Sequence, residues 1–158
     1  MKKRKILFVC LGNICRSAAA EAVMKAVLAR KGDDRFFVDS AGILSYHEGE
    51  KADRRMRYFA GLRGYDLTSI SRPVRSSDFE EFDYIIGMDD SNIDDLKERA
   101  TTIEQEAKIH KMTEFCVNIE ADHVPDPYYG GNEGFVRVLD LLEDACEGFY
   151  QWLISEKN

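Results

Sequence analysis

The stretch that decides the fold is ILFVCLGNICRSAAAEAV, residues 6–23. An apolar run of this kind is typical of a strand buried on both faces, and it predicts a strand over residues 5–9 that stops before Cys10. Apolar residues then recur at three- and four-residue spacing, which predicts a helix over residues 16–31 that ends at Gly32. The stretch therefore encodes a strand, a tight loop and a helix in succession.

The rest of the chain continues this alternation. The expected strands cover 36–39, 83–87 and 109–112, and the expected helices cover 53–64, the residues after 88 and a final segment from 135 to 153. In the 53–64 helix, the residues expected to face inward are Met56, Phe59, Ala60 and Leu62. Strands alternating with helices predict an α/β fold: one doubly wound domain over residues 1–158, with a mainly four-stranded parallel sheet and helices on both faces.

Composition excludes several classes of protein. The chain has 158 residues, 44% of them hydrophobic, which suits one domain with a buried core. Residues 1–35 carry nine Lys or Arg and three Asp or Glu, whereas the remainder carries 13 and 26, so the body is acidic and nucleic acid is not the expected partner.

The chain also lacks the marks of a membrane or secreted protein. It has no apolar run long enough to insert into a membrane, and the apolar stretch after its basic start is too short for a signal peptide. The four cysteines are too unevenly spaced for a disulfide scaffold. We expect a cytoplasmic protein with reduced thiols.

The loop after the first strand has the composition of an anion-binding site. In open α/β sheets, ligands bind beyond the carboxyl ends of the strands, and the start of a helix presents unpaired N–H groups and partial positive charge. Gly12 and Asn13 are residue types that tolerate left-handed backbone, which a loop around an anion needs. Arg16 adds a planar fork that matches two phosphate oxygens.

Cys10 would lie at the floor of this loop. A free cysteine has a pKa of about 8.5, which a helix N-terminus and nearby cations lower to roughly 3.5–7.5. Such a sulfur is a nucleophile directed at the bound phosphorus, and Ser17 can donate a hydrogen bond to it. A lone buried cysteine is usually packing and a lone arginine usually solvated, so the hypothesis depends on the whole Cys-x5-Arg pattern between strand and helix.

The segment VCLGNICRS resembles the phosphate-binding loop of the low-molecular-weight protein-tyrosine phosphatases. The resemblance extends over nearly the whole chain, through VDSAG, FDYIIGMDDSN and VPDPYYGG. It implies an enzyme that hydrolyses phosphotyrosine in proteins, and small aryl phosphates, through a phosphocysteine intermediate without a cofactor or metal. A tyrosine kinase is a further partner suggested by family analogy alone.

The resemblance also assigns roles to residues. Cys10 is the nucleophile, Arg16 binds phosphate, and Asp126 is first general acid and then general base. The implied phosphate-binding loop comprises Leu11, Gly12, Asn13, Ile14, Cys15, Arg16 and Ser17. Ser40 supports this loop through Asn13. The walls that hold the substrate ring are Tyr46, Tyr128 and Tyr129. The family often adds a histidine to the loop support, at a place that falls near Ser69 here. No role is assigned to His47, His110 or His123.

Several alternatives stay open. Cys15 either traps an oxidised Cys10 as a disulfide or packs under the loop, whereas Cys116 and Cys146 are interpreted as structural. The main functional alternative is a protein-arginine phosphatase; in the family, a threonine at the position of Ile14 is associated with phosphoarginine. A phosphate-binding module without activity, a metal site and an arsenate reductase fit less well. A metal site would need a Cys/His pair to complete a ligand set with Cys10 and Cys15, and the chain offers none. An arsenate reductase would need further cysteines after the third strand, where this chain has none.

Overall fold

The computed structural model describes residues 2–128 and 130–155, and it has the expected fold class. Its elements in chain order are β1 Arg4–Cys10, α1 Arg16–Lys31, β2 Phe36–Gly42, α2 Arg54–Leu62, α3 Asp78–Glu81, β3 Tyr84–Gly87, α4 Asp90–Arg99, α5 Ile103–Glu106, β4 Ile109–Lys111, the 3-10 helix η1 Met112–Phe115 and α6 Asn132–Ser155. Among these described residues, no helix combines the length and hydrophobicity needed to cross a bilayer.

The four strands form one parallel sheet in the order β2-β1-β3-β4. The chain leaves β1 toward β2 on one side and later returns to β3 on the other side, so the strand order reverses between β1 and β3. In open α/β sheets, the crevice at the carboxyl ends of two such strands is where ligands bind. The topology therefore places the loop after Cys10 at the expected binding position.

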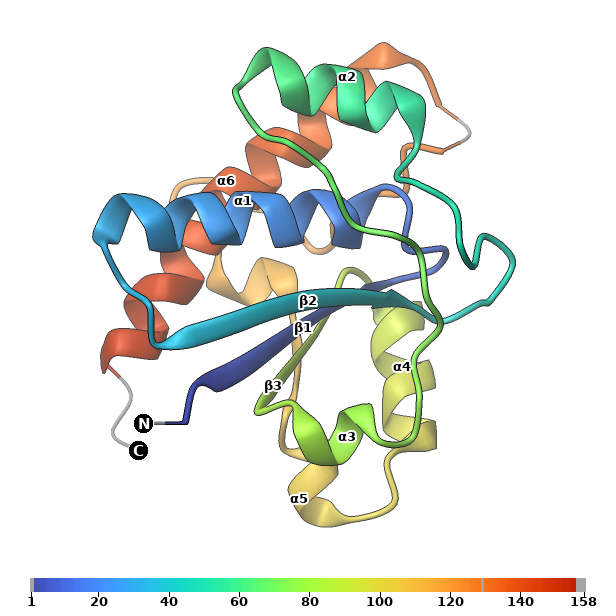
Figure 1. Ribbon diagram of the computed structural model, residues 1–158, viewed down its shortest axis with the longest axis vertical. Coiled ribbons are helices and arrows are strands. Elements are labelled where there is room, and N and C mark those ends of the chain that lie inside the picture. The colour runs from blue at the N-terminus through green and yellow to red at the C-terminus, as the bar shows by residue number, and fades with distance from the viewer. Residues whose placement is uncertain (1, 129, 156–158) are drawn as a thin grey trace.

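Alternate residues of β1 enter different cores because successive side chains of a strand point to opposite faces. Ile6 and Phe8 pack with the buried faces of α1 and α6, whereas Leu7 and Val9 pack with α3 and α4. Figure 1 shows the same division: α1, α2 and α6 lie on one side of the sheet, and α3, α4 and α5 lie on the other. Both faces of β1 are buried, which explains its continuous apolar sequence.

Several expected elements differ in detail. The strand expected over 36–39 continues to Gly42, and the helix expected over 53–64 is α2, which ends at Leu62. The expectation that Leu62 faces inward was wrong, because its side chain is 68% exposed on the last turn of α2. The short helices α3 and α5 were not expected. Each spans four residues, which is too short to show helical periodicity.

Candidate active site

From the last residue of β1 to the start of α1, five backbone carbonyl oxygens accept hydrogen bonds from neighbouring groups. The backbone carbonyls of Cys10, Leu11 and Ile14 accept hydrogen bonds from the N–H groups of Ile43, Leu44 and Asp53, at 2.8–2.9 Å. The Gly12 carbonyl accepts from the Ser71 hydroxyl at 3.0 Å, and the Cys15 carbonyl accepts from the Ala19 N–H within α1. Within the described part of the chain, the N–H groups of residues 11–15 donate to no other group, so they remain available to an anion.

Asn13 fixes the loop in an uncommon conformation. It is the non-glycine residue with positive φ among the described residues, at 56°, in the left-handed region. Its side-chain nitrogen donates to the hydroxyls of Ser17 and Ser40 at 2.8 and 3.0 Å, and its side-chain oxygen accepts from the Arg72 N–H. All its side-chain hydrogen-bonding groups thus hold the loop, and the sequence-based pairing of Asn13 with Ser40 agrees with this geometry.

Gly12 does not have the left-handed backbone that the sequence suggested, so that expectation was wrong. Its lack of a side chain serves close packing instead, because a Cβ at this position would lie 3.0 Å from Cδ2 of His47. Gly42, at the end of β2, has a similar role that the sequence analysis missed. A Cβ there would lie 3.0–3.1 Å from the backbone of the loop.

A buried series of hydrogen bonds leads from Glu21 on α1, through Ser40 on β2, to the Cys10 sulfur. The Ser40 hydroxyl donates to the Glu21 carboxylate at 2.6 Å and accepts from Asn13. The Ser17 hydroxyl also accepts from Asn13 and lies 3.1 Å from Cys10 Sγ. Its other nearby acceptor, the Ala41 carbonyl, is farther away at 3.4 Å. The Ser17 proton is therefore directed at the sulfur.

Arg16 is buried beside the loop and held by groups that come from other elements. Its Nη1 donates to the Asp89 carboxylate at 2.6 Å and to the Val124 carbonyl at 3.0 Å, and its Nη2 lies 3.6 Å from Asp126. Burial opposes its charge, but the electrostatic interactions with Cys10 and with the two carboxylates outweigh burial and raise the pKa of Arg16 above its ordinary value. Asp89 was missed in the sequence. Its place two residues after the end of β3, the strand next to β1, was the available signal.

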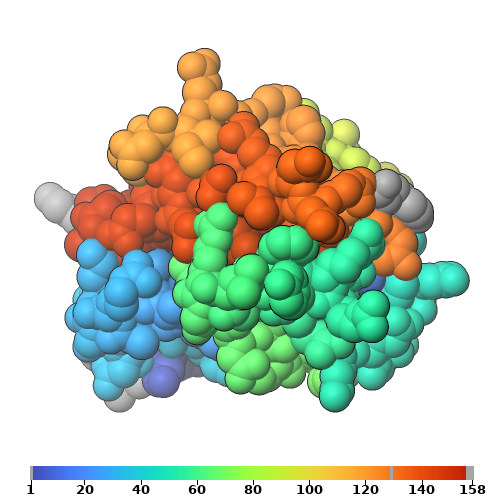
Figure 2. Space-filling model, turned by 90° about the horizontal axis from the view of Figure 1, so that it is seen from above, coloured from blue at the N-terminus to red at the C-terminus, as the bar shows by residue number. Residues whose placement is uncertain are grey.

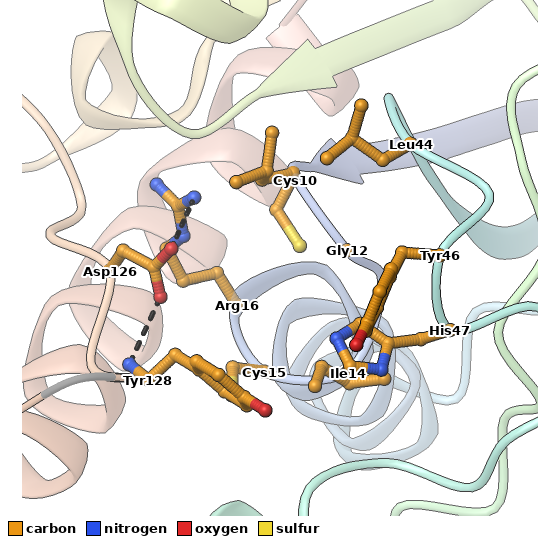
Figure 3. A pocket seen from close by; sticks show the side chains of 11 residues that line it. Cys10, Gly12, Ile14, Cys15, Arg16, Leu44, Tyr46, His47, Asp126 and Tyr128 are labelled. Carbon is orange, nitrogen blue, oxygen red and sulfur yellow. Dashed lines mark hydrogen bonds and ion pairs between the residues drawn. The ribbon is translucent and has the colours of Figure 1, made fainter.

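Most of the predicted site residues line one cavity of about 420 Å³, whereas Asn13, Ser17 and Ser40 lie behind the loop and do not line it. Its walls are formed by Cys10, Leu11, Gly12, Ile14, Cys15, Arg16, Leu44, Tyr46, His47, Asp126 and Tyr128 (Figure 3). The Asp126 carboxylate accepts a hydrogen bond from the Tyr128 N–H at 3.0 Å, as the dashed line in Figure 3 shows. Tyr129, the third predicted wall residue, lies outside the described residues.

His47 belongs to this cavity, although the sequence analysis gave it no role. Its ring centroid lies 4.7 Å from that of Tyr46, in an edge-on arrangement, and 5.8 Å from that of Tyr128. Its Nδ1 lies 3.2 Å from both carboxylate oxygens of Glu50, which orients the ring. Three rings therefore enclose an aromatic slot above the loop. Tyr46 is 82% exposed and forms its outer edge.

No histidine among the described residues supports the loop. The residues that support it on this side also differ from Ser69, the position near which the family's histidine was expected. Ser71 and the Arg72 backbone hold the loop from this side, whereas the Ser69 hydroxyl is buried without a hydrogen-bond partner among the described residues. The remaining histidines, His110 and His123, do not line the cavity. No group of three or more His, Cys, Asp or Glu side chains in the described ranges is arranged to hold a metal ion.

The other cysteines have environments unlike that of a reactive thiolate. All four cysteines are free thiols. Burial, followed by the nearby Asp53 carboxylate, raises the pKa of Cys15 well above its ordinary value, and burial does the same for Cys146 on the inner face of α6. Burial and Asp144 raise the pKa of Cys116 to about 11. These three thiols are therefore neutral at physiological pH.

Comparisons with known proteins agree with this architecture. A family model described as low molecular weight phosphotyrosine protein phosphatase matches residues 5–158. The low molecular weight phosphotyrosine protein phosphatase 1 of Drosophila melanogaster is 39% identical over 147 residues, which cover 92% of this chain and 94% of that relative.

Two solved structures are also similar. A protein tyrosine phosphatase from Entamoeba histolytica has a TM-score of 0.94 and 54% identity, with 97% of this chain and 98% of that chain covered. A Drosophila arginine phosphatase has a TM-score of 0.90 and 32% identity, with coverage of 99% and 100%. The chain belongs to the low molecular weight phosphotyrosine protein phosphatase family, and it is a phosphatase.

Proposed function

We propose that this protein, as one domain over its whole length, hydrolyses phosphotyrosine in proteins in two steps through a phosphocysteine on Cys10. One observation carries the proposal: the Cys10 sulfur lies in the cavity beside a loop whose N–H groups have no partner within the described residues, with Ser17 at 3.1 Å and Arg16 anchored by Asp89. A thiolate in that position is beneath any phosphate that the loop binds.

In the first step, Cys10 Sγ forms a bond to phosphorus while the bond to the tyrosyl oxygen breaks. The N–H groups of residues 11–15 and the Nε–Nη2 edge of Arg16 hold the equatorial oxygens, where charge develops. Nη1 is fixed by Asp89 and Val124, so we assign the phosphate to that edge, where Nη2 lies 3.6 Å from Asp126. Asp126 gives its proton to the departing tyrosyl oxygen, a contribution of about 10²–10⁴ in rate.

In the second step, Asp126 removes a proton from a water molecule, and the water oxygen attacks the phosphorus of the phosphocysteine. The S–P bond breaks, inorganic phosphate is released, and the electron pair returns to Cys10 Sγ. The hydrogen bond from Ser17 stabilises the sulfur as it regains negative charge. The enzyme itself supplies every group that moves a proton, so no cofactor is needed.

The aromatic slot supports phosphotyrosine as the substrate. Tyr46, His47 and Tyr128 offer flat faces above the loop, so a planar ring can bring its phosphate down to Cys10. The alternative substrate is phosphoarginine, because the structure is also similar to that of the Drosophila arginine phosphatase. We further propose a cytoplasmic location, which a reduced Cys10 requires, and a partner tyrosine kinase that supplies the phosphorylated substrate.

The test is a comparison of phosphotyrosine, phosphoserine and phosphoarginine peptides with the wild-type protein and the Cys10→Ser variant. We expect turnover of the phosphotyrosine peptide, with kcat/KM at least 100-fold above that of the others, a margin of about 3 kcal/mol. Cys10→Ser should abolish turnover and still bind phosphate. Faster hydrolysis of the phosphoarginine peptide would establish the alternative, and normal turnover by Cys10→Ser would exclude Cys10 as the nucleophile.

A further inference from the structure

Helix α2 and its flanks have a charge opposite to that of the protein. Residues 54–65 contain four arginines and no carboxylate, in a chain whose net charge is −7. Lys51 precedes them on the loop that leads into the helix. The concentration of positive charge on one element of an acidic protein indicates a surface that attracts an acidic partner.

This helix begins at the wall of the aromatic slot. The Asp53 N–H donates to the carbonyl of Ile14 on the phosphate-binding loop at 2.8 Å. The guanidinium of Arg55 donates to the Tyr128 carbonyl at 2.7 Å, which joins α2 to the opposite wall. Residues at the N-terminus of α2 therefore stand directly beside the place where a phosphotyrosine side chain would enter.

Three cations of this region, Lys51, Arg54 and Arg57, are exposed, and we call them the α2 patch. None of the three lies within 4 Å of a carboxylate of another described residue, whereas the neighbouring Arg55 and Arg63 both form ion pairs. Arg57 is held in place by a hydrogen bond from its Nε to the Ala52 carbonyl at 2.9 Å. The patch is thus positively charged without internal neutralisation, in a chain that has 29 acidic residues.

Figure 2 looks onto this side of the molecule. The green and teal surface of residues 50–65 faces the viewer, and it adjoins the orange surface at the start of α6 and the loop before it, which carries Asp126. Acidic residues also occur on the rim. Glu48 is exposed just before the patch, and Glu50 is engaged by His47 at 3.2 Å. The positive charge is therefore on the α2 side of the slot.

We propose that the α2 patch binds acidic side chains that flank the phosphotyrosine of the substrate protein. The substrates selected by this surface are phosphotyrosine segments rich in Asp or Glu, and the patch sets the preference among phosphotyrosine sequences. This inference rests on the proposed function, because it presupposes phosphotyrosine in the slot. Each exposed ion pair contributes a factor of about 1.4–5, so two or three pairs give a preference on the order of tenfold.

The experiment compares two phosphotyrosine peptides of equal length, one with flanking aspartates and glutamates and one with flanking lysines. The quantity measured is the ratio of their kcat/KM values. We expect a ratio of about ten at low ionic strength, which should decrease as the ionic strength rises from about 0.05 M to about 0.5 M because salt screens exposed charges. In the triple variant Lys51→Gln, Arg54→Gln, Arg57→Gln, the ratio should fall to within about twofold of one.

Lys3→Gln is the matched control. Lys3 is an exposed cation next to the start of β1, whereas Cys10 is the last residue of that seven-residue strand, about 20 Å away. Its removal should leave the ratio unchanged. If Arg57→Gln disturbs the loop through the lost bond to Ala52, the double variant Lys51→Gln, Arg54→Gln should still lower the ratio several-fold.

The outcomes separate this inference from the proposed function. If the wild-type protein hydrolyses neither phosphotyrosine peptide, the proposed function itself is wrong. If it hydrolyses both with a ratio near one, or if the triple variant keeps the wild-type ratio, the enzyme is a tyrosine phosphatase but the α2 patch does not select its substrates. A decrease in the ratio for Lys3→Gln as large as that for the patch would attribute the effect to net charge, and would also overturn the inference.

Discussion

Ser17→Ala removes the hydrogen bond that the structure directs at the Cys10 sulfur. Ser17 is fully buried, and its oxygen lies 3.1 Å from Sγ. Because Asn13 donates to the same oxygen at 2.8 Å and the Ala41 carbonyl is farther away at 3.4 Å, the hydroxyl proton is directed at the sulfur. A hydrogen bond to a charged group contributes about 1.5–3 kcal/mol, which corresponds to a factor of about 10–150 in rate.

The loss should appear mainly in the second step, because the sulfur regains its negative charge as the phosphocysteine breaks down. Stopped-flow absorbance with p-nitrophenyl phosphate separates the two steps. We expect Ser17→Ala to release about one equivalent of p-nitrophenol in a burst, followed by slow turnover, because phosphoenzyme accumulates when its breakdown limits the rate.

Ser40→Ala is the matched control. It removes the other hydroxyl to which Asn13 donates, at 3.0 Å, without removing a contact to the sulfur. This variant should lower the melting temperature and should show no burst. A Ser17→Ala protein without a burst and with unchanged kcat would refute the reasoning, as would a burst of equal size in Ser40→Ala.

Three further predictions concern the acid, a buried tyrosine and a tight helix contact. Asp126→Ala should slow hydrolysis most for aryl phosphates with poor leaving groups, as a series of substituted phenyl phosphates would show; equal slowing across the series would exclude its role as acid. Burial and the Glu143 carboxylate, 2.6 Å from the hydroxyl, raise the pKa of Tyr65 to about 12. Its contribution to stability is therefore complete below about pH 10, the unfolded value, and is lost as the pH rises through about 12. Ultraviolet titration should show one fewer late-ionising tyrosine in Tyr65→Phe than in wild type, and no difference between them would contradict this. Gly148→Ala should destabilise the protein by about 3 kcal/mol or more in denaturant unfolding, because a Cβ there would overlap a backbone carbonyl oxygen of η1. Gly61→Ala is the control: its Cβ would meet no neighbour, so it should be neutral or stabilising by up to about 1 kcal/mol. Similar changes in unfolding free energy for the two variants would be inconsistent with the packing.

The sequence predicted those helices and strands whose local signals, such as apolar spacing and helix-ending residues, agree with how the elements pack in the folded protein. Helix α1 begins and ends at the predicted residues, because Gly32 adopts φ 62° directly after its last turn. The single-turn helices α3 and α5 could not be predicted, because four residues carry no periodicity. Leu62 was misplaced because apolar spacing alone does not show where a helix leaves the core.

The candidate site was predictable as far as it lies in one contiguous motif. The motif supplied Cys10 and Arg16, the family resemblance supplied Asp126 from a distant loop, and the structure brings the three around one cavity. Two groups that act through tertiary contacts, Asp89 and Glu21, were not found. Asp89 meets Arg16 across 73 positions of sequence, and Glu21 reaches the loop only through Ser40. Such pairs depend on the sheet topology, which a local pattern does not contain.

The central claim, that Cys10 attacks phosphorus, is tested most directly by trapping the covalent intermediate. The protein is mixed with a phosphotyrosine peptide, denatured rapidly in acid, digested and analysed by mass spectrometry. We expect one phosphoryl group on the peptide that contains Cys10, assigned to the sulfur by fragmentation. A phosphoryl group on another residue, or turnover of the peptide with no phosphoenzyme at any quench time, would contradict the account.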